Sequence, residues 1–435
     1  MPLSLRLRRS LLLSAIALAV SPAFSSEEPE PNQSFEDIVT KNDSQTGKYR
    51  VVWIADPATT ATIGWHQADG SPARVYYGPI DFGRRPWRYA NSAPVHRVQE
   101  YDGMTNCFAR LENLEPDTAY FFCLADESGI GPRVKFRTAP DQPQAFTFIA
   151  GGDSRNFRDV RIEANRLCEK LRPLFVAFTG DMINQDVAPE WVEWLDDWQE
   201  TIGEDGNIIP IVPHRGNHER RPETIHHHFD TPPDAYFAFD LAGKLCRYYA
   251  LNSEIPATGA QEEWLEKDLA SHAKGVVHLL AGYHKPMRPH VSKKSEGTNP
   301  LQWADNFYAH GFDLVLESDS HVMKRTQPLK PDADGPEGFV AALEDPKATV
   351  YIGEGCWGAP LRPADDAKPW TLDTESFNGF DWIQVAPDGI EVKTVRIEDE
   401  VKVQPIDPAH PFESPAGLKL WEPRSGTYLR IPADS

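Results

Sequence analysis

The chain has 435 residues, of which 40% are hydrophobic and 25% charged, so its composition is that of a soluble protein with length for roughly two or three domains. Its 65 acidic side chains outnumber 44 basic ones, and the resulting net charge of −21 excludes long nucleic acid as the main partner while leaving room for a local cationic pocket for one small anion. Apart from one N-terminal stretch, no apolar run approaches the roughly 18 residues of a membrane span, and the composition excludes collagen, coiled coil and wholesale disorder.

Residues 1–25 predict a secretory signal peptide. A charged start, an apolar stretch and small residues at a cleavage position follow one another there, in Arg6, Arg8 and Arg9, in Leu11 to Val20, and in Ala23-Phe24-Ser25. Arg8-Arg9-Ser10-Leu11-Leu12 also resembles a twin-arginine signal, which would carry a folded protein with its cofactor across a membrane. The mature protein is therefore expected to be periplasmic or extracellular and to have no membrane span.

Residues 26–47 are acidic and polar and predict a linker, and residues 48–140 after it predict an all-β sandwich. Short alternating runs separated by turn residues have the spacing of strands, for example 51–54, 61–65, 73–77 and 120–123. The segment Leu111 to Tyr120 resembles the tyrosine corner of a fibronectin type III domain, in which the tyrosine hydroxyl bonds back to an upstream backbone group. Residues 131–140 are similar to the last strand of that family. The resemblance concerns the fold and carries no chemistry.

The cysteines form an odd and sparse set, without a C-x-x-C pair: Cys107, Cys123, Cys168, Cys246 and Cys356. This pattern does not indicate a disulfide framework, a zinc site or a redox motif. Cys107 and Cys123 are expected on neighbouring strands. They are either a disulfide or two buried thiols.

From about residue 144 the pattern becomes strand, loop and helix in alternation. The predicted strands are 145–150, 174–178, 208–212, 276–280 and 312–316, and the predicted helices are 160–171, one beginning at 191, and 261–272. Such alternation predicts an α/β domain whose sheets are covered by helices, over residues 141–400. The Pro-rich residues 401–435 are expected to be a C-terminal tail packed on the surface.

Several predicted strands end in a polar residue that can hold a metal: Asp153, Asp181, Asn217, His284 and His321. The loops beyond the carboxyl ends of strands gather at one rim in layered α/β proteins, so these side chains are expected to converge. Each residue alone has an ordinary explanation as a turn or a structural histidine, but the ordered set does not. Oxygen and imidazole ligands without a thiolate suit Mn, Fe, Zn or Mg.

In chain order, these motifs resemble those of the calcineurin-like metallophosphoesterases: Asp153-Ser154-Arg155, Gly180-Asp181, Gly216-Asn217-His218-Glu219, Tyr283-His284 and Ser318-Asp319-Ser320-His321. The resemblance is greatest to purple acid phosphatases, which often carry an N-terminal fibronectin-like domain. It implies a four-layer sandwich of two mixed β-sheets flanked by helices, preceded by the all-β domain.

The same resemblance implies a site for two divalent or trivalent metal ions, Fe, Mn or Zn. Asp181 would bridge the ions, with Asp153 and His321 on the first and Asn217 and His284 on the second. The implied reaction is in-line attack of metal-bound hydroxide on a phosphate ester. His218 would contact the phosphate and protonate the leaving oxygen.

Three positions depart from the family pattern. Arg155 stands where many members have a ligating histidine, and a guanidinium cannot coordinate a metal. Asn184 takes the place of the tyrosine of purple acid phosphatases and is a candidate weak ligand. Asp319 replaces the first histidine of Gly-His-x-His; a carboxylate still ligates, but it favours harder ions such as Mn²⁺, Fe²⁺ or Mg²⁺.

Arg155 has two alternative roles in this pattern: it grips two phosphate oxygens, or it forms an ion pair that orients Asp153. His290 is a candidate substrate-binding residue in a Pro-rich basic loop, although a solvated charge cluster is the favoured interpretation of that loop. The tract His226-His227-His228 is interpreted as surface or packing histidines. Trp357, in a Gly-rich turn, is expected to wall the pocket.

The sequence therefore predicts an exported, acid phosphatase-like hydrolase that acts on small phosphomonoesters. One alternative is a phosphodiesterase or nucleotidase on the same fold, which fold and metals do not separate. A second alternative is a catalytically impaired surface-binding protein. The sequence indicates no oligomeric state.

Overall fold

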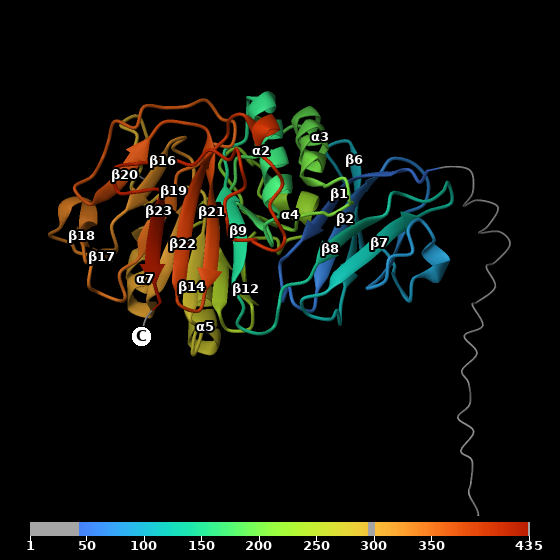
Figure 1. Cartoon of the computed structure of the whole chain (residues 1–435), viewed down its shortest axis with the longest axis horizontal. Helices are drawn as coiled ribbons and strands as arrows, with labels where there is room; N and C mark the ends of the chain where they lie inside the picture. Colours follow the sequence, from blue (N-terminus) through green and yellow to red (C-terminus); the bar gives the residue numbers. More distant parts are fainter. Residues whose placement is uncertain (1–42, 295–300, 434–435) are drawn as a thin grey trace, which may run out of the picture.

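The computed structural model describes residues 43–294 and 301–433. The predicted signal peptide and most of the predicted linker lie outside these residues, and the first strand already begins at Thr46. In Figure 1 the blue N-terminal strands stand at one end of the molecule and the orange and red strands of the C-terminal half at the other. The described part of the chain contains no helix that is both long enough and apolar enough to cross a membrane.

The N-terminal domain is built from two layers of short strands. Its own four-stranded sheet has the order β4 (Asn91–Ala93), β3 (Arg74–Gly78), β7 (Ala119–Ala125) and β8 (Val134–Arg137). The second layer consists of β1 (Thr46–Val52), β2 (Ala61–Gln67), β6 (Met104–Leu111) and β5 (Arg97–Tyr101). These two layers form the β sandwich predicted for this part of the chain.

The second layer does not end with the domain. Strand β1 pairs in parallel with β11 through Val52 and Ile211, which joins the N-terminal strands to the large sheet of the α/β domain. The result is one ten-stranded sheet that also includes β9 (Phe146–Gly151), β10 (Val176–Phe178), β11 (Ile211–Pro213), β21 (Gly379–Ala386), β22 (Gly389–Arg396) and β23 (Tyr428–Pro432). The predicted C-terminal tail thus contributes an edge strand as well as surface packing, because β23 pairs with β22.

The other large sheet of the α/β domain is mixed and has seven strands. In sheet order they are β12 (Phe237–Leu241), β13 (Cys246–Ala250), β14 (His278–Gly282), β15 (Phe312–Glu317), β19 (Val350–Gly353), β16 (Met323–Thr326) and β20 (Thr371–Glu375). A small antiparallel pair of strands, β17 (Leu329–Pro331) and β18 (Phe339–Ala341), follows β16 in the chain.

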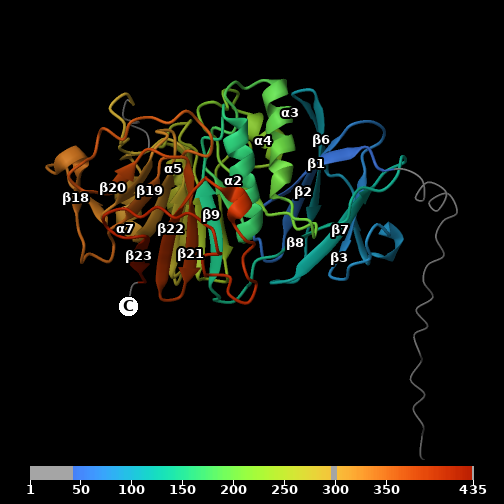
Figure 2. The same ribbon diagram turned by 45° about the horizontal axis from the view of Figure 1, so that its top comes forward.

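Helices cover the outer faces of both sheets, as Figures 1 and 2 show from two directions. The α-helices are α2 (Arg158–Leu171), α3 (Ala188–Asp197), α4 (Thr224–Phe229), α5 (Ala260–His272) and α7 (Ala304–His310). Short 3₁₀ turns occur at Pro86–Arg88, Trp198–Thr201, Pro336–Gly338 and Glu400–Lys402. The order helix, sheet, sheet, helix is the predicted four-layer sandwich.

Apolar side chains fill each space between the layers. Phe148 and Phe175 stack between the two sheets with ring centroids 4.8 Å apart. Trp191 and Trp194 of α3 pack against the outer face of the ten-stranded sheet, and Leu265 of α5 packs against the seven-stranded sheet. These three cores fix the strand ends, and therefore the loops that follow them.

The tyrosine corner predicted in the N-terminal domain is present. The hydroxyl of Tyr120 accepts a hydrogen bond from the backbone N–H of Glu115 at 2.8 Å, and Leu114 is buried beside it. Cys107 and Cys123 lie on β6 and β7, in different sheets, and both are buried free thiols. Burial raises the pKa of each thiol to about 12, so both are unreactive at neutral pH.

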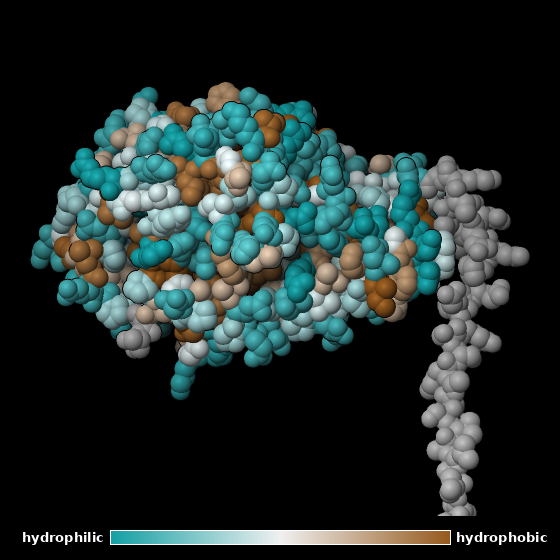
Figure 3. Space-filling model, in the orientation of Figure 1, coloured by the Kyte–Doolittle hydropathy of each residue, from teal (hydrophilic) through white to brown (hydrophobic). Residues whose placement is uncertain are grey.

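Most of the surface visible in Figure 3 is hydrophilic, with scattered apolar patches between polar side chains. This agrees with a chain in which 25% of the residues are charged.

Candidate metal centre

The polar residues predicted to converge come from the carboxyl ends of parallel strands in both large sheets. Asp153 follows β9, Asp181 follows β10, and His284 follows β14. Because β9, β10 and β11 run parallel, and β14 and β15 run parallel in the facing sheet, their C-terminal loops meet at one edge of the two-sheet sandwich.

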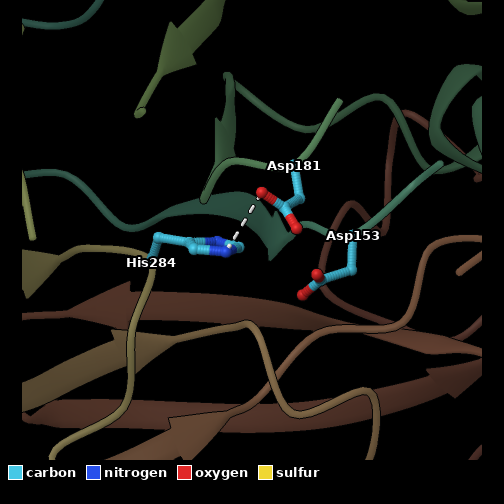
Figure 4. A group of neighbouring side chains, drawn as sticks. All are labelled: Asp153, Asp181 and His284. Carbon is cyan, nitrogen blue, oxygen red and sulfur yellow. Dashed lines mark ion pairs between the residues drawn. The ribbon is translucent and has the colours of Figure 1, made fainter. Parts of the chain in front are cut away.

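Three of these side chains form a compact cluster (Figure 4). Ligand atoms of Asp153, Asp181 and His284 all lie within 4.8 Å of one another, and all three residues are buried. The imidazole of His284 points at the Asp181 carboxylate, with Nε2 3.2 Å from Oδ1. Residues 153, 181 and 284 are thus brought together as the sequence predicted, although they are far apart along the chain.

The backbone at the cluster is strained. Asp153, Asp181, Asp319 and His321 all have positive φ angles, between 55° and 71°. Non-glycine residues rarely adopt this left-handed conformation, and where they do the strain is usually offset by a functional constraint. Each of these residues sits at the sharp turn by which a strand end delivers its side chain to the site.

The three histidines of the site are held in the same way. His218, His284 and His321 each place Nδ1 against a backbone carbonyl, that of Asn184 (2.5 Å), Thr179 (2.9 Å) and Pro360 (2.6 Å), respectively. A carbonyl oxygen only accepts, so Nδ1 is the protonated nitrogen in all three rings. Each ring therefore presents Nε2 to the centre, which is the orientation that metal-binding histidines are given by such carbonyl contacts.

Arg155 lies among residues that the sequence assigned to the first metal. Its Nη1 donates to Asn184 Oδ1 at 3.1 Å, its Nη2 donates to His321 Nε2 at 3.1 Å, and its Nε is 3.4 Å from Asp181 Oδ2. Arg155 therefore forms its ion pair with Asp181, and not with Asp153 as one of the two interpretations of the sequence proposed. His321 in turn lies 3.2 Å from Asp153 Oδ1 through the same Nε2.

Asp319 lies on the other side of the centre. Its Oδ1 is 3.6 Å from His284 Nε2 and forms an ion pair with the ammonium of Lys294. Its backbone N–H donates to Asp153 Oδ2 at 2.7 Å. Asn217 follows β11 on the adjoining loop, half-buried, between Gly216 and His218.

The electrostatics of the cluster call for positive charge at its middle. Burial opposes the charged forms of Asp181 and Asp319, but His284 beside both, and Lys294 beside Asp319, lower the pKa of each carboxyl below its ordinary range. Burial also opposes charge on His284, but Asp181, Asp319 and Asp153 raise its pKa well above the usual value. The Nε2 position of His284 therefore favours a cation, either a proton or a metal ion.

The residues present fit a metal ion in this cluster. Asp153 Oδ1, Asp181 Oδ2 and His284 Nε2 are buried and have no hydrogen-bond partner among the described residues. Buried polar atoms are rarely left unpaired, and an ion is one of the recognised reasons. Two carboxylates and one imidazole are suitable ligands for Mn, Fe or Zn.

Glu219 is a site residue that the sequence reasoning did not single out. Its carboxylate accepts three backbone N–H bonds, from Asp181 (3.0 Å), Met182 (2.8 Å) and Gly216 (2.7 Å). It thereby ties the loop after β10 to the loop after β11. Its place as the last residue of Gly216-Asn217-His218-Glu219 was the available signal. Burial and then the Asp181 carboxylate raise its pKa to about 8.

His290 does not have the predicted substrate-binding position. Its ring is fully buried, Nδ1 bonds to Glu354 Oε1 at 2.8 Å, and Nε2 bonds to the Thr371 hydroxyl at 2.7 Å. Both nitrogens are thus occupied inside the protein. Glu354 also contacts the ammonium of buried Lys324, 2.9 Å away, and Lys324 contacts Glu317, so His290 belongs to a buried charge network behind the site.

The histidine tract of α4 and Trp357 were also interpreted from the sequence, and neither lies at the cluster. Of the histidines of α4, His228 is buried with Nε2 3.1 Å from Asp102, whereas His226 and His227 are half-buried and His227 contacts Arg97. Trp357 is buried and donates from Nε1 to Asn165 at 3.0 Å. It packs against the back of the β9 loop, where a Cβ on Gly151 would meet its ring, and it does not line the opening as expected.

Comparison with known proteins agrees with this architecture. Residues 48–138 match the family described as the purple acid phosphatase N-terminal domain, and residues 150–323 match the calcineurin-like phosphoesterases. Two uncharacterized proteins of Mycobacterium tuberculosis are each 24% identical to the chain over 329 residues. That match covers 63% of this chain and 60% of each relative, so the chain spans about three fifths of their length.

Solved structures show the same fold at low sequence identity. Purple acid phosphatase PPD1 from seeds of yellow lupin (Lupinus luteus) superimposes with a TM-score of 0.66 at 14% identity, over 84% of this chain and 74% of that one. The structure of PhoD superimposes with a TM-score of 0.62 at 11% identity, over 90% of this chain and 93% of that one. These likenesses concern the fold, and the chemistry rests on the residues described above.

Proposed function

Since the chain is a calcineurin-like phosphoesterase with a purple acid phosphatase N-terminal domain, we propose that it is an exported, metal-dependent phosphatase that hydrolyses small phosphomonoesters. The phosphoesterase class follows from the family. The preference for monoesters and the export are the parts proposed here, and each has its own experiment.

One observation supports the preference for monoesters: the acidic side chains of the site are buried, and basic side chains lie nearer to solvent. The carboxylates of Asp153 and Asp181 are fully buried, whereas the side chains nearer to solvent are Arg155, His218 and Lys294, which are 11%, 19% and 22% exposed. An otherwise acidic protein with a net charge of −21 therefore presents a basic entrance at this point. Such a local field selects a small anion, and a dianion more strongly than a monoanion.

A bound metal ion would polarise the phosphoryl oxygens and lower the pKa of a water molecule at the centre. The chain's own groups then have defined tasks. His218 Nε2 faces the site 3.7 Å from Asp181 Oδ2, because Nδ1 is held by the Asn184 carbonyl, and so the imidazolium form of the ring is placed to deliver its Nε2 proton to the leaving oxygen. Lys294 and Arg155 hold positive charge where the phosphate enters.

We expect purified protein, supplied with Mn²⁺ or Fe²⁺, to turn over p-nitrophenyl phosphate with a kcat/KM about tenfold or more above that for its bis ester, which corresponds to about 1.4 kcal/mol. The reason is the second negative charge of the monoester beside three basic side chains. A chelator-treated sample serves as the control. A higher kcat/KM for the bis ester would instead identify a phosphodiesterase, and no turnover of either would reject the phosphoesterase function.

The export part of the proposal rests on residues 1–25, which lie outside the described structure. We expect protein recovered from an expressing bacterium to begin near Ser26, as determined by N-terminal sequencing, because the small residues Ala23 and Ser25 suit a signal peptidase. Replacing Arg8 and Arg9 together by lysine should block export if the twin-arginine route is used and leave it intact otherwise. A cytoplasmic product that retains Met1 would contradict export.

A further inference from the structure

The guanidinium of Arg155 lies among the side chains that the family resemblance assigns to the first metal. Of the residues assigned to that metal, Asp181, Asn184 and His321 each contact one of its three nitrogens, at 3.4, 3.1 and 3.1 Å. The Arg155 side chain is only 11% exposed, so it is part of the site and not a surface residue above it.

Most of the donors of Arg155 are used inside the protein. A guanidinium has five N–H groups. Nη1 donates to Asn184 and also to Asn156, at 3.1 Å each, Nη2 donates to His321, and the Nε–H points at Asp181. One N–H on Nη2 is left without an acceptor, and the Nε–H is buried and makes no hydrogen bond within the described residues. Because Nε is buried and both N–H groups of Nη1 are used, a two-pronged grip on phosphate is not available to Arg155 in this arrangement.

The atoms around the guanidinium need a cation. His321 Nε2 carries a lone pair, because Nδ1 donates to Pro360, and it faces Asp153 Oδ1 at 3.2 Å. Two lone-pair atoms at that distance repel unless positive charge lies beside them. Nη2 of Arg155 supplies that charge at 3.1 Å from the same nitrogen. Arg155 thus provides the charge compensation that a metal would provide, and a permanently charged side chain cannot be displaced by deprotonation.

The other half of the centre is open to an ion. Asp153 Oδ1, Asp181 Oδ2 and His284 Nε2 lack hydrogen-bond partners within the described part of the chain, and the three residues cluster within 4.8 Å. We infer that the centre holds one divalent ion, bound by Asp153, Asp181 and His284, and that Arg155 replaces the second ion of the family. This inference rests on the proposed function, since it concerns the same site.

The charges agree with this arrangement. Asp153, Asp181 and Asp319 contribute −3, and Arg155 and Lys294 contribute +2, so one divalent ion brings the centre to +1 and two would bring it to +3. The lower figure already attracts a phosphate dianion. A second divalent ion would have to enter beside a guanidinium a few ångströms away, at a large Coulomb cost in a buried site.

The inference is tested by counting metal. The full mature chain is loaded with excess Mn²⁺, desalted, and examined by elemental analysis and by electron paramagnetic resonance. We expect about one Mn²⁺ per chain with the six-line signal of an isolated ion. Arg155→His, which restores the Asp-x-His of the family, should bind about two ions and give the signal of an exchange-coupled pair.

Matched variants separate the possible outcomes. Arg155→Lys keeps a cation and should stay at one ion, and Arg166→His makes the same change at a residue that is 48% exposed and should also stay at one. Two coupled ions in the unaltered protein, or one ion in Arg155→His shown to be folded by its melting curve, would overturn the inference. Failure of the proposed function would look different: one ion present, as inferred, but no hydrolysis of any phosphate ester.

Discussion

Replacing Asp181 by asparagine is expected to lower kcat/KM for p-nitrophenyl phosphate by about three orders of magnitude, which corresponds to about 4 kcal/mol. Asp181 contacts both His284 and Arg155: its Oδ1 is 3.2 Å from His284 Nε2, and its Oδ2 is 3.4 Å from Arg155 Nε. Asparagine has the same shape but no charge, so His284 and Arg155 lose their common counter-ion and the metal ion loses an anionic ligand.

The same variant should lose its metal, which elemental analysis measures independently of activity. Its fold should be retained, because asparagine can still accept the 2.8 Å hydrogen bond from the backbone N–H of His218 through its carbonyl oxygen. Asp141→Asn makes the identical change at an exposed carboxylate and should leave metal content and turnover unaltered. Normal activity in folded Asp181→Asn would show that the cluster is not the catalytic centre.

Replacing Lys324 by methionine is expected to lower the free energy of unfolding by about 3–5 kcal/mol. Lys324 is 1% exposed and lies between the carboxylates of Glu317 and Glu354, both fully buried. Methionine fills similar space but leaves two buried negative charges without their cation. The loss is measured from the shift of the urea midpoint of unfolding, provided that the slope of the unfolding free energy against urea concentration is unchanged. Lys402→Met removes an exposed ion pair with Asp399 and should cost about 0–1 kcal/mol.

This variant should also gain stability as the pH falls from 7 to 5, a range in which the contribution of Glu354 is nearly constant in the unaltered protein. Burial would raise the pKa of Glu354, but Lys324 and then His290 hold it at about 2 in the unaltered protein. A carboxyl with a lowered pKa contributes stability above its unfolded pKa, about 4.5, and loses it as the pH falls toward 2. Without Lys324, burial dominates and the pKa rises. Acidification then protonates the carboxyl and stabilises the variant, whereas equal slopes for both proteins would contradict this account.

Much of the fold was predictable because its strands and helices have strong local patterns. The strand predicted at 145–150 is β9 at Phe146–Gly151, and the helix predicted at 160–171 is α2 at Arg158–Leu171. The hairpin of β21 and β22 also carries a local signal, since Pro387-Asp388-Gly389 separates two alternating runs. No local pattern reveals that β21 returns to pair with β9, far back in the chain, or that β1 pairs with β11.

The residues of the candidate site could be predicted better than the contacts that they make with one another. Residues that end strands of a parallel sheet must meet, and this places Asp153, Asp181 and His284 together from sequence alone. The direction of a long side chain cannot be predicted in this way. The sequence could not tell whether Arg155 extends outward to substrate or folds back among Asn184 and His321, because that depends on neighbours thirty to one hundred and sixty positions away. His290 was misplaced for the same reason, since its partner Glu354 follows far along the chain.

The pairing of β1 with β11 has a consequence for how this protein can be divided. A cut between the two domains would leave the backbone of β11 as an unpaired edge, and such an edge tends to recruit strands from other molecules. The Trp53 side chain, which is 1% exposed beside Phe175 at a centroid distance of 5.8 Å, would be lost from the core at the same point. An excised α/β domain is therefore expected to be prone to self-association.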